Sequence, residues 1–426
     1  MYPLAEGRLL CRFVVCGLLL LGVGCGATAR IGVLSEALHG DLVDAGVTPA
    51  DSMAIDPEYL DRLQDALRQE LVRCSATSGV EQPKPINILA LSGGGMYGAF
   101  DVGVLQGWTA SGKRPTFDVV TGISTGSLIA TFAFLGPKYD DFLKEAYLTL
   151  TSEKVYRKKP LASGVFSESL ASSKPLKKQI DEAITPEVVK EIAAAHKQGR
   201  RLFVGTTNLD TRKLVIWDMG AIAAGEKPGS VELFRTILLA SASIPAFFPP
   251  VYIDIEVDGK KSREMHVDGG ATSSVFIRPF MLHLHPDNPG LRVGSSMYVI
   301  SSGKLFADPQ AVEPKLFSIT TNAISSLLYA GTRTDIFYLY NLALHTGMNF
   351  QLIAVPQDFT VNPDSLTFDP KELKRLYDLG YRMGATQEGW RNKPPDVDLK
   401  EQYLPRTGVE LKHRQPEPVR EMKKKE

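Results

Sequence analysis

The chain has 426 residues, with 48 Lys and Arg balanced by 48 Asp and Glu, and 44% of its residues are hydrophobic. This composition is typical of a globular protein with one large or two medium domains, and it excludes disorder of the whole chain. A zero net charge excludes the broad basic surface of nucleic-acid binders, so we expect no nucleic-acid partner. Three of the four cysteines lie in the first 25 residues, which excludes a disulfide framework and a cysteine-rich zinc site.

The N-terminus carries a targeting pattern. Arg8 and Arg12 precede an apolar run that ends at Gly24 and is too short to span a bilayer comfortably, which predicts a secretory signal. The run closes with small residues and Cys25 and resembles the bacterial lipoprotein box, although Gly22 stands where that box usually has Leu. The resemblance implies that Cys25 is lipidated, for instance with palmitate, and anchors the mature protein to a membrane of the bacterial cell envelope, facing the periplasm. A plain secretory signal or an uncleaved anchor is the alternative.

Beyond the signal, a first helix opens at Asp56 and Pro57, and a proline-rich boundary follows at residues 82–85. Strand and helix patterns then alternate, which predicts an α/β fold, a three-layer α/β/α arrangement around a mostly parallel central sheet. An apolar helical segment over residues 314–345 is expected in the core or a covering layer, with a lipid groove as the alternative, and the core is favoured. The predicted strands are Ile86–Leu91, Phe117–Val120, Arg201–Val204, Lys213–Ile216 and Met297–Ile300.

The first chemical motif is a G-x-S-x-G sequence formed by Gly122, Ser124 and Gly126, directly after the second predicted strand. An apolar helix over residues 127–135 follows and is closed by Gly136 and a proline. This order of strand, tight turn and helix is typical of a nucleophile elbow, in which the serine hydroxyl is exposed at the positive end of the helix. Ser124 is therefore the candidate nucleophile.

The second motif is a glycine-rich loop after the first predicted strand, and it includes Gly93, Gly95 and Gly98 in G-x-G-x-x-G spacing. Three consecutive glycines let backbone N–H groups converge at a helix N-terminus, where they can hold a phosphate or a developing oxyanion. A dinucleotide site is the alternative, but it needs an acidic residue at the end of the second strand. Asp118 has the spacing but lies near the start of that strand, which disfavours the nucleotide site.

The third motif is Asp268 followed by Gly269 and Gly270, after a short strand-like segment. A carboxylate at a strand end followed by glycines can approach a hydroxyl closely and accept its proton. His266 precedes Asp268 by two residues, so both side chains point to one face of an extended strand. A Ser-His-Asp triad is therefore an alternative to a Ser-Asp dyad, and the dyad is favoured.

Together the three motifs, in this order, resemble the patatin-like phospholipases. The resemblance extends to the Ala-Ser and Phe-Pro segment at residues 240–250 and covers roughly residues 86–281. It implies that Ser124 is the nucleophile, that Asp268 is the general base, and that backbone N–H groups of the glycine loop form the oxyanion hole. Tyr97 stands where that family commonly has Arg or Lys, which removes a charge-assisted contact with an oxyanion or a lipid phosphate. The expected oxyanion-hole residues are Gly94, Gly95 and Met96.

The resemblance further implies a lipid acyl hydrolase that cleaves acyl esters through an acyl-enzyme and needs no cofactor. A catalytically silent lipoprotein that binds lipid or a partner is the alternative. His283 and His285 share an i, i+2 spacing, but no further ligand pattern surrounds them, so no metal site is expected. The expected substrate is a lipid or another acyl ester, and the sequence leaves the oligomeric state open. The expected domains are a signal peptide at 1–24, an N-terminal tether and helix at 25–85, a catalytic core at 86–281, a C-terminal part that completes or covers the fold at 282–395, and a charged tail at 396–426.

Overall fold

The computed structural model describes residues 84–160, 167–225, 227–257, 260–282, 292–361 and 365–395. The expected signal peptide, Cys25 and the helix that begins at Asp56 lie outside the described residues, as do His283, His285 and the charged tail. Within the described residues, no helix is long and apolar enough to cross a membrane.

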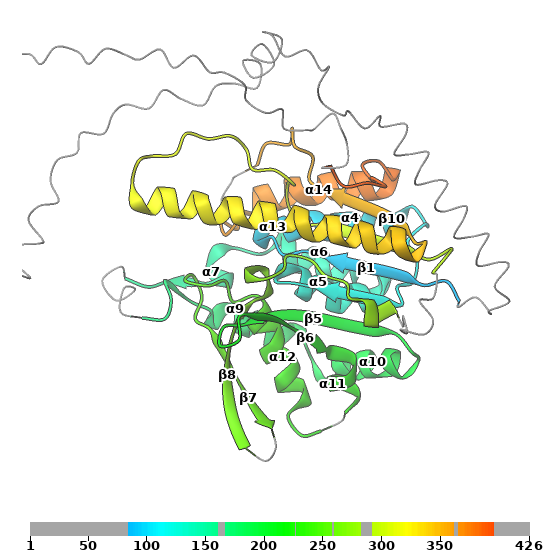
Figure 1. Ribbon diagram of the computed structural model, residues 1–426, viewed down its shortest axis with the longest axis horizontal. Coiled ribbons are helices and arrows are strands. Elements are labelled where there is room, and N and C mark those ends of the chain that lie inside the picture. Colours follow the sequence, from blue (N-terminus) through cyan, green and yellow to red (C-terminus); the bar gives the residue numbers. More distant parts are fainter. Residues whose placement is uncertain are drawn as a thin grey trace, which may run out of the picture. The chain divides into compact units, whose positions relative to one another are not determined.

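A mostly parallel central sheet forms the middle layer (Figure 1). Within the described residues it has eight strands in the order β10-β9-β1-β2-β5-β8-β7, and β6 pairs with β5. The five strands from β10 to β5 are parallel, whereas β6, β7 and β8 join antiparallel. The strands are β1 (Asn87–Leu91), β2 (Val119–Gly122), β5 (Arg201–Asn208), β6 (Lys213–Asp218), β7 (Val251–Val257), β8 (Lys260–Asp268), β9 (Ser296–Ser301) and β10 (Asn349–Ala354). A separate short sheet pairs β3 (Arg157–Lys158) with β4 (Ala171–Ser172).

Helices cover both faces of the central sheet, which confirms the predicted three-layer α/β/α fold. The α-helices are α4 (Gly98–Ala110), α5 (Thr125–Leu135), α6 (Asp140–Leu148), α7 (Ser152–Val155), α9 (Lys174–Ala183), α10 (Pro186–Lys197), α11 (Met219–Ala224), α12 (Ser230–Ser241), α13 (Leu316–Thr346) and α14 (Pro370–Thr386). The short 3-10 helices are η2 (Gly95–Tyr97), η3 (Pro137–Tyr139), η4 (Gly269–Ala271) and η5 (Pro279–Leu282).

The alternation of side chains along β1 separates the two halves of the core. Leu89 and Leu91 pack in the cluster formed with α4, α5, α10, α12 and α14, whereas Ile88 and Ala90 pack in the cluster formed with α13 and η5. Successive side chains of a strand point to opposite faces, so a central parallel strand with helices on both sides must be apolar at every position. This requirement explains the continuous apolar run that predicted β1.

The predicted strands all occur, and the sheet also contains strands that the sequence pattern did not predict. β10 extends the parallel edge beyond β9, and β7 pairs with β8 in a hairpin that projects from the sheet (Figure 1). The predicted strand at Lys213–Ile216 is antiparallel to β5, because a tight turn joins the two. Strands β9 and β10 lie in the expected C-terminal part, and the expected domain boundaries remain predictions.

Contacts divide the chain into two units. Within the described residues the smaller unit is Pro309–Ala323, which includes the first residues of α13, and the larger unit holds the sheet and the remaining helices. In the larger unit, α13 is buried at Ile336 and Leu339, but Leu327 and Leu328 are 72% and 47% exposed. The expectation of a core helix over residues 314–345 is therefore correct only for its second half.

Helix α14 packs closely against α4, because glycines of each helix lie against the backbone of the other. A Cβ atom at Gly103 would collide with the backbone of Tyr377, and one at Gly380 would collide with the backbone of Phe100. The two helices therefore pack backbone against backbone, which holds α4 firmly. The N-terminus of α4 follows directly on the glycine-rich loop.

Candidate active site

Ser124 lies in a sharp turn between β2 and α5. Its backbone has φ 54° and ψ −128°, a conformation that L-residues rarely adopt and that costs of order 1–3 kcal/mol. The turn is tight because Gly122 and Gly126 lack side chains, since a Cβ atom at either position would collide with neighbouring backbone. Such strain concentrates at functional sites, and here it presents Ser124 ahead of the first turn of α5.

The Ser124 hydroxyl lies close enough to the Asp268 carboxylate to act on it as a hydrogen-bond donor that lowers its pKa. Asp268 ends β8 and is 5% exposed, and its Oδ1 atom also accepts the Gly270 N–H at 2.7 Å. Burial raises the pKa of the Asp268 carboxyl to about 6, and the two hydrogen bonds oppose this rise because they favour the ionised form. The structure thus brings together the two residues that the sequence proposed as nucleophile and base.

The glycine-rich loop lies against Ser124, because a Cβ atom at Gly93 would lie 3.1 Å from the Ser124 Cβ. The Gly93 N–H donates to the Ser274 carbonyl at 3.2 Å. The Gly94 and Gly95 N–H groups have no acceptor among the described residues, as expected for the first residues of η2. Two backbone donors beside Ser124 therefore remain available to an anion.

Met96 requires a correction to the expected set of oxyanion donors. Its N–H donates to the Ser365 carbonyl at 2.8 Å, so this donor is already engaged. Two of the three expected donors, Gly94 and Gly95, are left.

Tyr97, where a basic residue was expected by resemblance, is buried and 6% exposed. Burial is the main cause that raises the pKa of its hydroxyl, and the neighbouring Tyr329 adds to the rise. The side chain therefore supplies no positive charge to the site.

His266 is fully buried, and both of its ring nitrogens already have partners. Nδ1 lies 2.9 Å from the Thr206 hydroxyl, and Nε2 lies 3.0 Å from Glu264 Oε2. Trp217 Nε1–H donates to the same Thr206 hydroxyl, so the ring belongs to a polar network within the sheet. A relay from Asp268 through His266 to Ser124 would require that network to break.

Ser241 is a residue of the site that the motifs did not single out. Its hydroxyl accepts the Ser124 N–H at 3.0 Å and donates to the Gly205 carbonyl at 2.8 Å. The side chain is fully buried at the C-terminal end of α12. Its position within the segment 240–250, which carried part of the family resemblance, was the only signal in the sequence.

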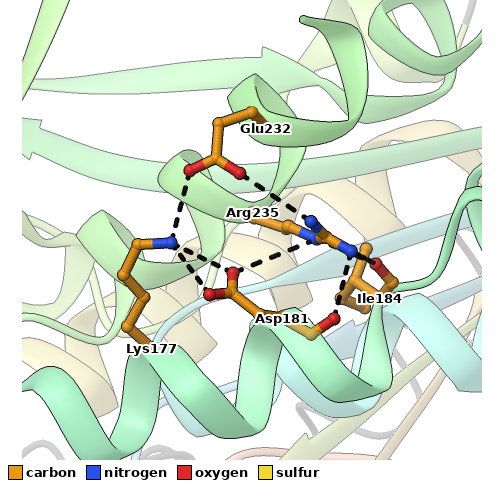
Figure 2. Close-up of polar contacts among 5 residues, drawn as sticks. All are labelled: Lys177, Asp181, Ile184, Glu232 and Arg235. Carbon is orange, nitrogen blue, oxygen red and sulfur yellow. Dashed lines mark hydrogen bonds and ion pairs between the residues drawn. The ribbon is translucent and has the colours of Figure 1, made fainter.

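Helix α12 is tied to α9 by the polar contacts that Figure 2 shows. Lys177 contacts Asp181 at 3.0 Å and Glu232 at 3.3 Å. The Arg235 guanidinium donates to the Ile184 carbonyl and to the Asp181 carbonyl, which are unpaired at the end of α9. Exposed ion pairs contribute little stability, so the bonds to carbonyl groups are the more important link. They hold the helix that carries Ser241.

The structure also bears on the dinucleotide alternative. The Asp118 carboxylate accepts the Asn87 N–H at 2.8 Å, at the amino ends of β1 and β2. The glycine-rich loop follows the carboxyl end of β1, at the opposite edge of the sheet. Asp118 therefore cannot reach a ribose held at the loop. Among the described residues, no group of three or more His, Cys, Asp or Glu side chains is arranged to hold a metal ion.

A mostly parallel sheet between helical layers, with a strained serine between a strand and a helix, defines the class of α/β proteins that have a nucleophile elbow. Residues 89–281 match the family model described as patatin-like phospholipase. At the level of the family, this match supports a lipid acyl hydrolase. None of the curated proteins with which the chain was compared matches it.

The chain is also similar to three solved structures at low identity. VipD from Legionella pneumophila is 13% identical, with a TM-score of 0.34, and the match covers 72% of this chain and 68% of VipD. The type III effector protein ExoU is 13% identical, with a TM-score of 0.33, over 72% of this chain and 54% of ExoU. Human GIVD cytosolic phospholipase A2 is 12% identical, with a TM-score of 0.35, over 79% of this chain and 63% of that protein.

Proposed function

We propose that this protein is a serine hydrolase that cleaves acyl esters of lipids through a dyad of Ser124 and Asp268. The observation that carries the proposal is the proximity of the Ser124 hydroxyl to the buried Asp268 carboxylate, together with two backbone N–H groups of the glycine loop without acceptors among the described residues. A hydroxyl, a base and oxyanion donors are the groups that acyl transfer needs at one place.

In the proposed reaction, Asp268 accepts the Ser124 proton while Oγ attacks the ester carbonyl carbon. The electron pair of the C=O bond moves to the oxygen, and the Gly94 and Gly95 N–H groups stabilise this oxyanion. Its collapse breaks the ester C–O bond, and the leaving alcohol takes the proton from Asp268. Water then attacks the acyl-enzyme, gives a proton to Asp268 and releases the acid, and the proton returns to Ser124.

The electrostatics of Asp268 support this role. A carboxyl with a pKa of about 6 is a stronger base than an ordinary aspartate and is still ionised at neutral pH. Each oxyanion donor is typically worth about 3 kcal/mol of transition-state stabilisation, so the glycine loop contributes as much as the base.

Two features support a lipid as the substrate. The family match of residues 89–281 is to phospholipases. In addition, Leu327 and Leu328 of α13 are exposed next to Tyr329, which interacts electrostatically with Tyr97 of the glycine loop. Exposed apolar side chains on α13 favour contact with a substrate that carries a hydrocarbon chain.

Labelling with a fluorophosphonate probe and hydrolysis of p-nitrophenyl butyrate test the proposal. Wild-type protein is expected to be labelled and to hydrolyse the ester, whereas Ser124→Ala loses both. Ser230→Ala is a matched control, because the Ser230 hydroxyl only contacts the Lys227 carbonyl at the start of α12. Release of fatty acid from phosphatidylglycerol vesicles tests the lipid substrate. A wild-type protein with neither labelling nor hydrolysis would overturn the proposal in favour of a lipid- or partner-binding protein.

We also propose that Cys25, outside the described residues, is acylated and anchors the protein to a membrane of a bacterial cell envelope. The support is the apolar run before Cys25 and the small residues that close it. Each acyl methylene adds about 0.8 kcal/mol of membrane affinity, so several chains give stable anchoring. Expression in bacteria fed alkyne-tagged palmitate is expected to label wild type and Cys16→Ala but not Cys25→Ala. Equal labelling of the Cys25 variant would overturn the anchor.

A further inference from the structure

Asp101 is a buried acid that the proposed mechanism does not use. It lies in the first turn of α4 and is fully buried. Within the described part of the chain its Oδ1 atom has no hydrogen-bond partner, and its Oδ2 atom lies 2.5 Å from Ser302 Oγ. Burial raises the pKa of Asp101 well above its usual range. Tyr147 is the titratable neighbour that interacts with it electrostatically.

The contacts of the Ser302 hydroxyl indicate whether the Asp101 carboxyl is protonated. Ser302 Oγ lies within hydrogen-bond distance of both Asp101 Oδ2 and the Ser92 carbonyl, at 2.5 Å and 2.8 Å. A hydroxyl has one hydrogen, and a carbonyl can only accept. If Asp101 were ionised, Ser302 could donate its single hydrogen to only one of the two oxygens. The other contact would then join two oxygen atoms with no hydrogen between them. A protonated Asp101 satisfies both, because it donates to Ser302, which donates to the Ser92 carbonyl.

Ser302 and Ser92 also connect Asp101 to the glycine loop by hydrogen bonds. The Ser302 N–H donates to Ser92 Oγ at 2.8 Å, and the Ser92 hydroxyl donates to the Gly93 carbonyl at 2.9 Å. A peptide unit is planar and trans, so its C=O and N–H point in opposite directions. When Ser92 holds the Gly93 carbonyl, the Gly94 N–H is turned to the opposite side, which leaves it available as an oxyanion donor.

The glycine loop also contacts Ser302 directly, at Gly94. A Cβ atom at Gly94 would collide with the Ser302 carbonyl oxygen. A change in the position of Ser302 therefore changes the position of Gly94. Ser302 follows β9, so Asp101 in α4 and the end of β9 hold the loop between them.

We propose that Asp101, in its protonated form, is a positioning residue that orients the Gly94 N–H through Ser302 and Ser92. The inference rests on the proposed function and adds a residue that touches neither the substrate nor the reacting atoms. The Asp101 side chain acts as a hydrogen-bond donor to Ser302. We therefore expect the amide of Asp101→Asn to preserve this function and the methyl group of Asp101→Ala to lose it.

Steady-state hydrolysis of p-nitrophenyl butyrate by folded variants tests the role. Asp101→Ala is expected to lower kcat by about 10- to 100-fold with KM nearly unchanged, because the loss of one oxyanion donor costs about 100- to 1,000-fold and here the donor is only misaligned. Asp101→Asn is expected to keep kcat within about threefold of wild type, since its amide donates to Ser302. Ser302→Ala is expected to match Asp101→Ala, and the double variant to be no slower, because both act in one chain of bonds.

Asp140 is the matched control. It is also a buried aspartate, but its side chain pairs with the Arg114 guanidinium at 2.7 Å and with Thr109 at the C-terminal end of α4, away from the glycine loop. Asp140→Ala and Asp140→Asn are both expected to lower the melting temperature and to leave kcat unchanged. An Asp101→Ala protein with wild-type kcat, or an Asp101→Asn protein as slow as Asp101→Ala, would overturn the positioning role. Where Asp101→Ala does not fold, Ser302→Ala and Asp101→Asn decide in the same way.

An infrared difference spectrum gives a readout that does not depend on catalysis. Wild type minus Asp101→Asn at neutral pH is expected to show the C=O stretch of a protonated carboxylic acid. Carboxylate bands in its place would overturn the proposal. Wild type that neither hydrolyses the ester nor reacts with the fluorophosphonate would overturn the proposed function itself, whereas hydrolysis that survives Asp101→Ala would overturn only the positioning role.

Discussion

The backbone N–H of Ser124 donates to the hydroxyl of Ser241 at 3.0 Å. Ser241 in turn donates to the Gly205 carbonyl in β5. The Ser241 hydroxyl therefore links the strained turn at Ser124 to both α12 and the sheet. The hydroxyl supports the backbone of the candidate nucleophile and leaves the Ser124 side chain free to contact Asp268. This relationship leads to the first prediction.

Ser241→Ala is expected to lower the free energy of unfolding by about 1–3 kcal/mol, because it leaves the buried Ser124 N–H without its partner and removes the hydrogen bond to the Gly205 carbonyl. It is also expected to lower kcat, since the Ser124 turn loses its support. Denaturant unfolding and ester hydrolysis measure the two effects. Thr131→Val is the control, because it removes a buried hydroxyl of α5 that only contacts the Ser127 carbonyl. Equal kcat in the Ser241 and Thr131 variants would contradict the prediction.

The pH dependence of hydrolysis is expected to follow Asp268. The base must be ionised, so kcat/KM is expected to rise through a pH of about 6 and to level off above it. A profile of kcat/KM against pH measures this directly. A rate that stays flat from about pH 5 to about pH 8 would contradict the assignment of Asp268 as the base.

His266→Gln separates the role of Asp268 in the reaction from that of the nearby histidine. Because both nitrogens of His266 contact Thr206 and Glu264, we expect the variant to keep most of the wild-type kcat. Its kcat/KM profile is expected to retain the rise through a pH of about 6. A loss of activity as large as that of Ser124→Ala, in a folded protein, would show that the dyad is wrong.

Asp268→Asn is expected to abolish hydrolysis and to stabilise the fold at neutral pH. The folded pKa of about 6 lies above the value of about 3.9 in an unfolded chain, so between these values the folded state holds a proton that the unfolded state has lost. The stability contributed by Asp268 is therefore lost as the pH rises through about 6. Removal of the carboxylate in Asp268→Asn is expected to raise the free energy of unfolding by about 1–3 kcal/mol near pH 8 and to change it little near pH 4.

Denaturant unfolding at the two pH values measures this difference. Asp378→Asn is the control, since Asp378 is exposed on α14 and pairs with Lys374. We expect that control to change the free energy of unfolding by less than about 0.5 kcal/mol. An Asp268→Asn protein that is less stable than wild type near neutral pH would contradict the burial argument.

Gly94→Ala is expected to lower kcat by about 100-fold, because its Cβ collides with Ser302 and displaces an oxyanion donor. Gly331→Ala is the matched control, since a Cβ atom at Gly331 in α13 would meet no atom within 4 Å. The control is expected to keep kcat and to gain about 1 kcal/mol of stability from helix propensity. Hydrolysis rates and denaturant unfolding of the two variants check these outcomes, and a Gly94 variant of normal activity would contradict the role of the loop.

Much of the fold could be predicted because its signals are local. The apolar run of β1 and the glycine and proline that close α5 at residues 136–137 predicted elements that the structure confirms. The pattern did not predict β10 or the half-exposed position of α13. Whether an apolar segment is buried depends on what packs against it, and no local pattern records that partner.

The order of the three motifs, and with it the pair Ser124 and Asp268, came from the sequence by itself. The turns at Ser124 and at Asp268 depend on glycines a few residues away in the chain. Because these interactions are local, the sequence pattern alone can predict them. Only the tertiary structure decided that the Met96 N–H is engaged by Ser365, that Ser241 supports Ser124, and that Asp101 reaches the glycine loop through Ser302. Each of these contacts joins segments far apart in the chain, so it exists only after the sheet has brought them to one edge.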